Sequence, residues 1–336
     1  MKCAEINISG FLFRVTCAEE KYNDIVDWLK DDFAACASAT GLAGDTALSN
    51  RTGHTPTLIS EIEINEFKRP KSLPIFWRPG LFVYKTKTST YYSYNSDETK
   101  LEIVFGEKRH LKVFGQNIDK LHYIIYLSII SHLVETLEKE GWMPIHAFSA
   151  SYKSKNFALI APSGFGKSRL ALKLMNDTEF QVFGDELAFI RNDELLPIPL
   201  RFAVAKPVLD MLGIGTKGLR PLFQDGRLHK ITLPAPNERD VSPLRIDQLI
   251  LVSNKSNLWR ALSKKISGID TWFMLLSAVG VPQMVQYLLR LNFIFRLPTI
   301  IYSRYKIMRS LENADLYFEV EGDPADISGL KEILLR

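Results

Sequence analysis

Cysteine is scarce in this chain, and none of it occurs in a paired motif. The three cysteines among 336 residues are Cys3, Cys17 and Cys36, all near the N-terminus and without a CxxC spacing. An odd number in this arrangement argues against a disulfide framework and against a zinc site. We therefore expect a reducing, cytoplasmic environment.

A long uncharged apolar run is also lacking. The most apolar stretch, residues 271–302, is interrupted by Pro282, Arg290 and Arg296. A membrane-spanning helix needs about 20 apolar residues, so we expect no membrane span. The first residues show no three-part signal-peptide pattern. A net charge of +4 is too small to predict nucleic acid as a partner without a concentrated basic patch.

The length and the average composition predict about two domains of a globular protein. Residues 81–106 alternate β-branched and aromatic residues with polar ones, which is typical of strands. A long helix begins near Asn117 or Asp119 and ends before Gly141. We place a domain boundary near residue 118, with a β-rich N-terminal domain over 1–118 as a candidate for substrate recognition. The second domain then covers 119–336 and ends in helices.

Residues 161–168, APSGFGKS, fit a P-loop with alanine in the first position. An apolar strand candidate enters the loop, and a helix former leaves it. Glycines let main-chain N–H groups cradle phosphate oxygens, Lys167 can reach the β- and γ-phosphates, and the Ser168 hydroxyl can bind Mg²⁺. The pattern predicts nucleotide binding by Ser163, Gly164, Phe165, Gly166, Lys167, Ser168 and Arg169.

An acidic pair follows the next predicted strand. Asp185 and Glu186 lie 18 and 19 residues after Lys167, which leaves room for one helix, so we expect the two strands to be neighbours. One carboxylate could hold Mg²⁺ beside the P-loop serine, directly or through water. The other could accept a proton from an attacking hydroxyl or position a water molecule.

Four further residues are candidates around this site. His146 precedes the strand that enters the P-loop. Arg201 is a candidate contact for a nucleotide or acceptor phosphate, with a surface salt bridge as the alternative. Arg220 and Arg227 lie in residues 211–240, a basic Gly- and Pro-containing stretch that is either a lid over the phosphate and acceptor or an ordinary solvated loop.

The order of His146, the P-loop and the Asp185–Glu186 pair resembles the HPr kinase/phosphorylase family. The later segments Leu195–Lys206 and Val241–Asn254 resemble strands of the same family. The resemblance implies an α/β (α+β) fold with a phosphoenolpyruvate-carboxykinase-like core, with ATP and Mg²⁺ as cofactors. Carried over, Asp185 is the general base for a serine hydroxyl, Glu186 and Ser168 serve Mg²⁺, and His146 orients Asp185.

The chain also departs from that family. Ala161 replaces the usual first glycine, Pro162 removes one main-chain donor, and Glu186 is longer than the aspartate common there. The C-terminal motif linked to phosphorolysis is not found, and the N-terminal third shows no match. A specialised relative is therefore expected, such as the kinases that phosphorylate lasso-peptide precursors on serine.

Three functions stay open at this point. The leading hypothesis is an ATP-dependent serine kinase acting on a peptide or protein. The alternatives are a kinase of a small hydroxylated metabolite, such as free serine, and an NTP-binding or NTP-hydrolysing switch. A homo-oligomer is expected from the family alone. A predicted helix over residues 277–295 is either core or a groove for a peptide acceptor.

Overall fold

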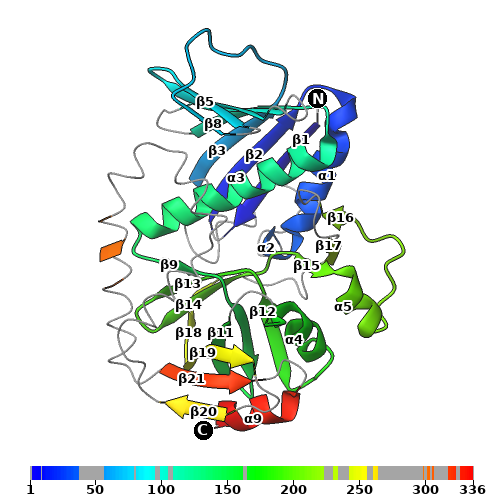
Figure 1. Cartoon of the computed structure of the whole chain (residues 1–336), viewed down its shortest axis with the longest axis vertical. Coiled ribbons are helices and arrows are strands. Elements are labelled where there is room, and N and C mark those ends of the chain that lie inside the picture. The colour runs from blue at the N-terminus through cyan, green and yellow to red at the C-terminus, as the bar shows by residue number, and fades with distance from the viewer. Residues whose placement is uncertain are drawn as a thin grey trace, which may run out of the picture. The chain divides into compact units, whose positions relative to one another are not determined.

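The computed structural model describes most of the chain (Figure 1). Its described residues are 2–8, 10–37, 57–78, 81–94, 99–104, 109–161, 165–222, 230–233, 242–255, 260–263, 298, 301–302, 305, 317–322 and 326–335. They form a mixed α/β protein, which confirms the general fold class that we predicted. The predicted helix over 277–295 lies outside these residues. Within them, no helix is long and apolar enough to cross a membrane.

The chain divides into two compact units. The first is Met1–Glu135 with Leu222–Arg227, and the second is Thr136–Pro221 with Leu228–Arg336. The division falls inside the long helix α3 (Ile118–Lys139) rather than at its first turn, where the sequence places it.

The first unit is built on one eight-stranded sheet. Strands β2 and β3 pair in parallel, as do β3 and β8, and the other neighbours are antiparallel. In spatial order the strands are β1 (Lys2–Ile8), β2 (Phe11–Cys17), β3 (Thr57–Ile64), β8 (Arg109–Phe114), β7 (Thr99–Val104), β6 (Ser89–Tyr94), β5 (Leu81–Lys85) and β4 (Phe76–Arg78).

Helices of the first unit cover one face of this sheet, where α3 runs along the strands (Figure 1). The Oδ1 atom of Asn117 accepts a hydrogen bond from the N–H of Lys120 at 2.9 Å, and Gly141 has a φ of +88° just after the last turn. The predicted cap and stop of α3 are thereby confirmed. The shorter helices are η1 (Glu20–Tyr22), α1 (Asn23–Asp32) and α2 (Ala34–Ala37).

A buried polar pair joins α1 to α3. The Nε2 atom of His122 lies 2.7 Å from Oδ2 of Asp32, and both side chains are buried. The ring of Trp28 meets the His122 ring edge-on at 5.5 Å. Because a buried polar group is costly unless it is hydrogen-bonded, this contact fixes how the two helices face each other.

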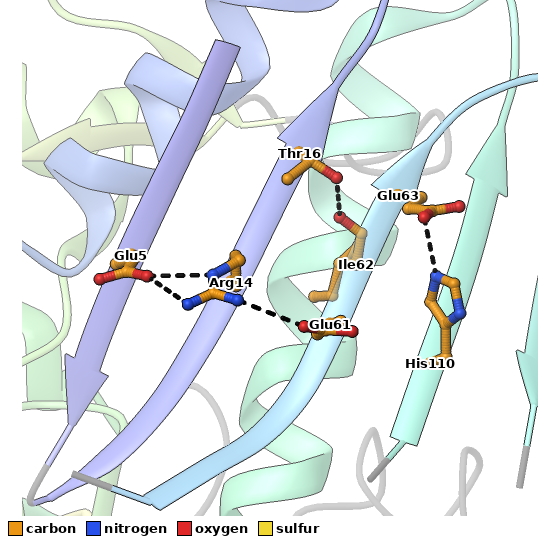
Figure 2. A network of polar contacts seen from close by, with 7 residues as sticks. All are labelled: Glu5, Arg14, Thr16, Glu61, Ile62, Glu63 and His110. Atoms are coloured by element: carbon orange, nitrogen blue, oxygen red, sulfur yellow. Dashed lines mark hydrogen bonds and ion pairs between the residues drawn. The ribbon is translucent and has the colours of Figure 1, made fainter. Parts of the chain in front are cut away.

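On the opposite face of the sheet, charged side chains of β1, β2, β3 and β8 are paired across strands (Figure 2). The Nη2 atom of Arg14 lies 2.8 Å from Glu5, and its Nη1 atom lies 3.4 Å from Glu61. The hydrogen bonds that Arg14 donates to the Glu5 carboxylate are the main cause that raises the pKa of Arg14. His110 lies 3.3 Å from Glu63. Because positive and negative side chains alternate across neighbouring strands, their charges compensate one another on this part of the face.

The described strands that follow α3 form three sheets. The six-stranded sheet has the order β12 (Phe180–Gly184), β10 (Phe148–Tyr152), β11 (Lys155–Ile160), β19 (Gln248–Lys255), β21 (Tyr317–Gly322) and β20 (Arg260–Ser263). The four-stranded sheet consists of β18 (Leu244–Arg245), β14 (Glu194–Ile198), β13 (Leu187–Arg191) and β9 (Met143–Ile145). The three-stranded sheet consists of β15 (Phe202–Ala205), β17 (Lys230–Leu233) and β16 (Pro221–Leu222).

Two hydrophobic clusters separate the layers of the second unit. On one face of the six-stranded sheet, α4 (Lys167–Leu174) and α9 (Ile327–Leu335) contribute Leu170 and Leu330 to a cluster that also contains Phe148. On the other face, Ala158 and Ile190 belong to a cluster shared with the four-stranded sheet. The six-stranded sheet is therefore a central layer with apolar packing on both faces.

Lys331 on α9 anchors the helix to the segment before β12. Its Nζ atom lies 2.7 Å from Oδ2 of Asp177 and 2.6 Å from Oε2 of Glu179. Hydrogen bonds from Lys331 lower the pKa of both carboxyls below their ordinary values of 3.8 and 4.5. The same contacts, first of all that with Asp177, raise the pKa of Lys331.

These pKa shifts predict an acid-sensitive contribution to stability. A carboxyl with a lowered pKa stabilises the fold above its ordinary pKa, and the contribution is lost as the pH falls through the folded-state pKa. The raised pKa of Lys331 adds a loss only at pH values above 10.5. In Lys331→Met, the urea midpoint should therefore fall less between pH 7 and pH values below 3.8 than in the unaltered chain. Lys173→Met on α4 is the matched control, and an equal acid loss in all three proteins would contradict the assignment.

Candidate functional site

The strand that enters the P-loop is β11, and the helix that leaves it is α4, as predicted. The expected neighbour relation between β11 and β12 is wrong, because β10 lies between them. A tight turn with positive φ at Lys153 and Ser154 folds β10 back onto β11 as a hairpin. That hairpin occupies the edge of β11, so β12 pairs with β10 instead.

Register nevertheless brings the ends of β11 and β12 to one edge of the sheet. Ser149 in β10 lies opposite Ala158 in β11 and opposite Gly184 in β12. Strands β11 and β12 both run antiparallel to β10, so their C-terminal ends point in the same direction. Adjacent strands are about 4.8 Å apart, which places the two chain ends about 10 Å from each other. The P-loop and the acidic pair therefore leave the sheet at the same edge.

The described residues on either side of the P-loop show how β11 ends and α4 begins. Gly166 adopts a φ of +108°, a left-handed conformation that favours glycine, and α4 begins at the next residue. The Nζ atom of the buried Lys167 donates a hydrogen bond to the carbonyl oxygen of Ala161 at 2.9 Å. This contact joins the first residue of α4 to the residue that follows β11.

The other residues predicted to contact a nucleotide differ in how exposed their side chains are. Phe165 is buried in the cluster beneath α4, so its side chain belongs to the core and only its main chain is suited to a ligand. Ser168 and Arg169 are half-buried in the first turn of α4. Ser163 and Gly164 lie outside the described residues.

A β-bulge lies near the end of β12, shortly before Asp185. Ser149 pairs with Gly184 and Ala150 pairs with Val182, so Phe183 is an extra residue in β12. A Cβ atom on Gly184 would lie 2.8 Å from the carbonyl oxygen of Ile198, hence Gly184 faces the four-stranded sheet. The buried Asp185 follows Gly184 in a bend, two residues after the bulge residue Phe183.

Gly184→Ala tests this close approach. The added methyl group would meet main-chain atoms of Ile198, which cannot move aside as a flexible side chain could. We expect a loss of about 1–3 kcal/mol in the free energy of unfolding, as for other overpacked sites. Gly215→Ala is the control, because nothing lies within 4 Å of that position. Urea unfolding measures both, and equal stability of the two variants would contradict the predicted clash.

His146 contacts the acidic pair through the main chain. Its Nδ1 atom lies 2.8 Å from the carbonyl oxygen of Glu186. A carbonyl oxygen only accepts hydrogen bonds, so Nδ1 carries the proton. The imidazole thus ties the segment between β9 and β10 to the bend that follows Asp185.

The three arginines are placed differently. Arg201 is 3% exposed between β14 and β15, which excludes the surface salt bridge that we considered. Arg220 is half-buried, and its carbonyl oxygen accepts a hydrogen bond from the N–H of Thr232 at 2.8 Å. Arg227 lies outside the described residues. The stretch 211–240 is not a loop throughout, because β16 and β17 fall within it and β17 pairs with β15.

The donor atoms at this edge suit a hard cation. Ser168 offers a hydroxyl oxygen and Glu186 a carboxylate oxygen, and Mg²⁺ prefers oxygen ligands completed by water and substrate phosphates. The described residues contain no group of three or more His, Cys, Asp or Glu side chains placed to hold a metal. The hydroxyl of Ser168 and the carboxylate of Glu186 are oxygen donors of the kind that would fit Mg²⁺.

Sequence reasoning missed two features of the chain just before Asp185. Neither the extra residue Phe183 nor the close approach at Gly184 follows from residue pattern, although a glycine beside a predicted strand end is a weak signal for such an approach. Comparison with known proteins adds no identification, because no family model and no curated protein matches the chain.

Proposed function

We propose that this chain is an ATP-dependent kinase that transfers the γ-phosphate to a serine hydroxyl of a peptide or protein. The observation that supports the proposal best is the shared sheet edge of the P-loop and Asp185. Phosphoryl transfer needs a phosphate-binding element and a proton acceptor close together, and it needs little other covalent chemistry from the protein.

Charge on the phosphates would be stabilised by three features of the loop. Lys167 brings an ammonium group that is already held by the carbonyl of Ala161. The N-terminus of α4 adds main-chain N–H groups and the positive end of the helix dipole. Gly166 supplies the left-handed conformation from which α4 starts.

Asp185 is the residue that we assign to proton transfer. The acceptor oxygen attacks the γ-phosphorus, the bond from that phosphorus to the bridging oxygen of ADP breaks, and the hydroxyl proton passes to the Asp185 carboxylate. The carboxylate is buried at 6% exposure. A base held in one place contributes about 10²–10⁴-fold to such a reaction.

The neighbouring residues have supporting roles in this proposal. When bound, Mg²⁺ neutralises part of the phosphate charge, and Ser168 and Glu186 are the residues that would hold it. His146 acts as a positioning residue through the carbonyl of Glu186. The buried Arg201 follows Ile198 and Pro199, which pack against Gly184, so it lies on the segment beside the acidic pair.

The experiment follows the label of γ-labelled ATP. The full chain is incubated with ATP and Mg²⁺, in parallel with a pool of serine-containing peptides, with free serine and with no acceptor. The proposal expects label on peptide serine. Label on free serine would instead identify a metabolite kinase, and release as inorganic phosphate alone would identify a hydrolytic switch. Either result, or the absence of turnover with every acceptor, contradicts the proposal.

A further inference from the structure

The sheet of the first unit ends at β4. Among the residues that the structure describes, β4 pairs with β5 on one side and with no strand on the other. The N–H of Ile75, just before β4, donates to the carbonyl oxygen of Val83 at 2.8 Å. Within the described part of the chain, the outer edge of this three-residue strand therefore has main-chain donors and acceptors with no strand beside them.

Three large apolar side chains are exposed in β4 and in the segment that leads into it. Leu73 is 87% exposed, Ile75 48% and Trp77 68%. Trp77 belongs to β4, whereas Leu73 and Ile75 precede the strand, with a bend at Ile75. Trp77 lies opposite Phe82 in the register of β4 and β5. An exposed apolar group of this kind marks an interaction site or an aggregation hazard, and it differs from singly scattered apolar residues.

Basic side chains lie in the same segment. Lys68, Arg69 and Lys71 are exposed, whereas Glu66 is the acidic residue of the segment from 65 to 78. The guanidinium of Arg69 lies 5.2 Å from the ring centre of Tyr84. At the other end of the sheet, the charges of Arg14 and its neighbours are paired with carboxylates (Figure 2). Exposed positive charge therefore accompanies the apolar side chains within the segment from 65 to 78.

We propose that the β4 edge binds an extended acidic polypeptide segment by strand addition. Main-chain hydrogen bonds to β4 would give affinity, and alternate apolar side chains would pack on Leu73, Ile75 and Trp77. Acidic residues of the partner would face Lys68 and Lys71, which favours encounter. The proposal concerns a binding surface of the first unit and does not depend on kinase activity.

Two other occupants fit the surface less well. A second copy of the same edge would place its own basic residues near Lys68 and Lys71, and like charges at close range are unfavourable. A lipid surface would take the apolar side chains, but it offers no partners for the main-chain groups of an open strand, which is costly in hydrocarbon.

Binding is tested with a capped, fluorescently labelled peptide in which glutamate and valine alternate. Its anisotropy should show saturable binding to the full chain, weakened by salt. Trp77→Ser should weaken binding about tenfold or more, and Lys68→Glu with Lys71→Glu should weaken it and reduce the salt dependence. Met175→Ser and Lys30→Glu, which alter other exposed residues, should leave the affinity unchanged. Circular dichroism confirms that each variant is folded.

Backbone-methylated peptides separate strand addition from simple apolar contact. Methylating every second peptide nitrogen removes the donors on one side of a strand, so one set of methylations should abolish binding and the alternate set should preserve it. Equal binding of both peptides would overturn the proposal, as would the absence of saturable binding. It would also fail if Trp77→Ser changed only the chain's self-association, or only its binding to vesicles of phosphatidylcholine and phosphatidylserine.

Discussion

Asp185→Asn is expected to reduce phosphoryl transfer by about 10²–10⁴-fold, because it removes the carboxylate that would accept the hydroxyl proton. Asparagine has nearly the same shape, so the bend after Gly184 and the bulge in β12 should persist. The measurement is the single-turnover rate of label transfer from γ-labelled ATP at saturating nucleotide, with nucleotide affinity measured separately by equilibrium binding.

The control for Asp185→Asn is Asp193→Asn, which alters an exposed carboxylate in the turn between β13 and β14. It should leave the transfer rate unchanged. A kinase proposal with Asp185 as base requires a fall in rate with retained nucleotide affinity. Weaker nucleotide binding together with an unchanged rate at saturation would show that Asp185 has another role.

Lys167→Met is expected to produce the second large effect. Methionine keeps the length of the buried stem but removes the ammonium group that lies 2.9 Å from the Ala161 carbonyl. Loss of one preorganised charge at a transferring phosphoryl group costs about 10²–10³-fold in rate. The charge also contributes to binding the ground-state phosphates, so we expect weaker nucleotide affinity as well, unlike in Asp185→Asn.

Lys173→Met gives a matched control on the same helix, because Lys173 lies in the last turn of α4 and is half-buried. Its nucleotide affinity and transfer rate should equal those of the unaltered chain. If both lysine variants lost affinity alike, the effect would come from the stability of α4 and not from the position of Lys167. Thermal unfolding of both variants separates these cases.

Local signals in the sequence were enough to predict several elements. Asn117 and Gly141 allowed the start and the end of α3 to be predicted, because helix capping and left-handed termination depend on nearby residues. The strand before the P-loop and the helix after it were predicted for the same reason. The structure of residues 211–240 was harder to predict. Residues 230–233 form β17 because they pair with β15, which lies about 25 residues earlier in the chain.

The sequence by itself determined the residue types of the candidate site and their order: a P-loop, then an acidic pair, with a histidine before both. These follow from short-range chemistry, because phosphate-binding turns and helix starts are encoded within a few residues. The tertiary structure decided the rest. In the folded chain β10 lies between β11 and β12, Phe183 forms a bulge in β12, and Gly184 packs against Ile198. Strand order and close backbone approach depend on long-range pairing, which no local pattern specifies.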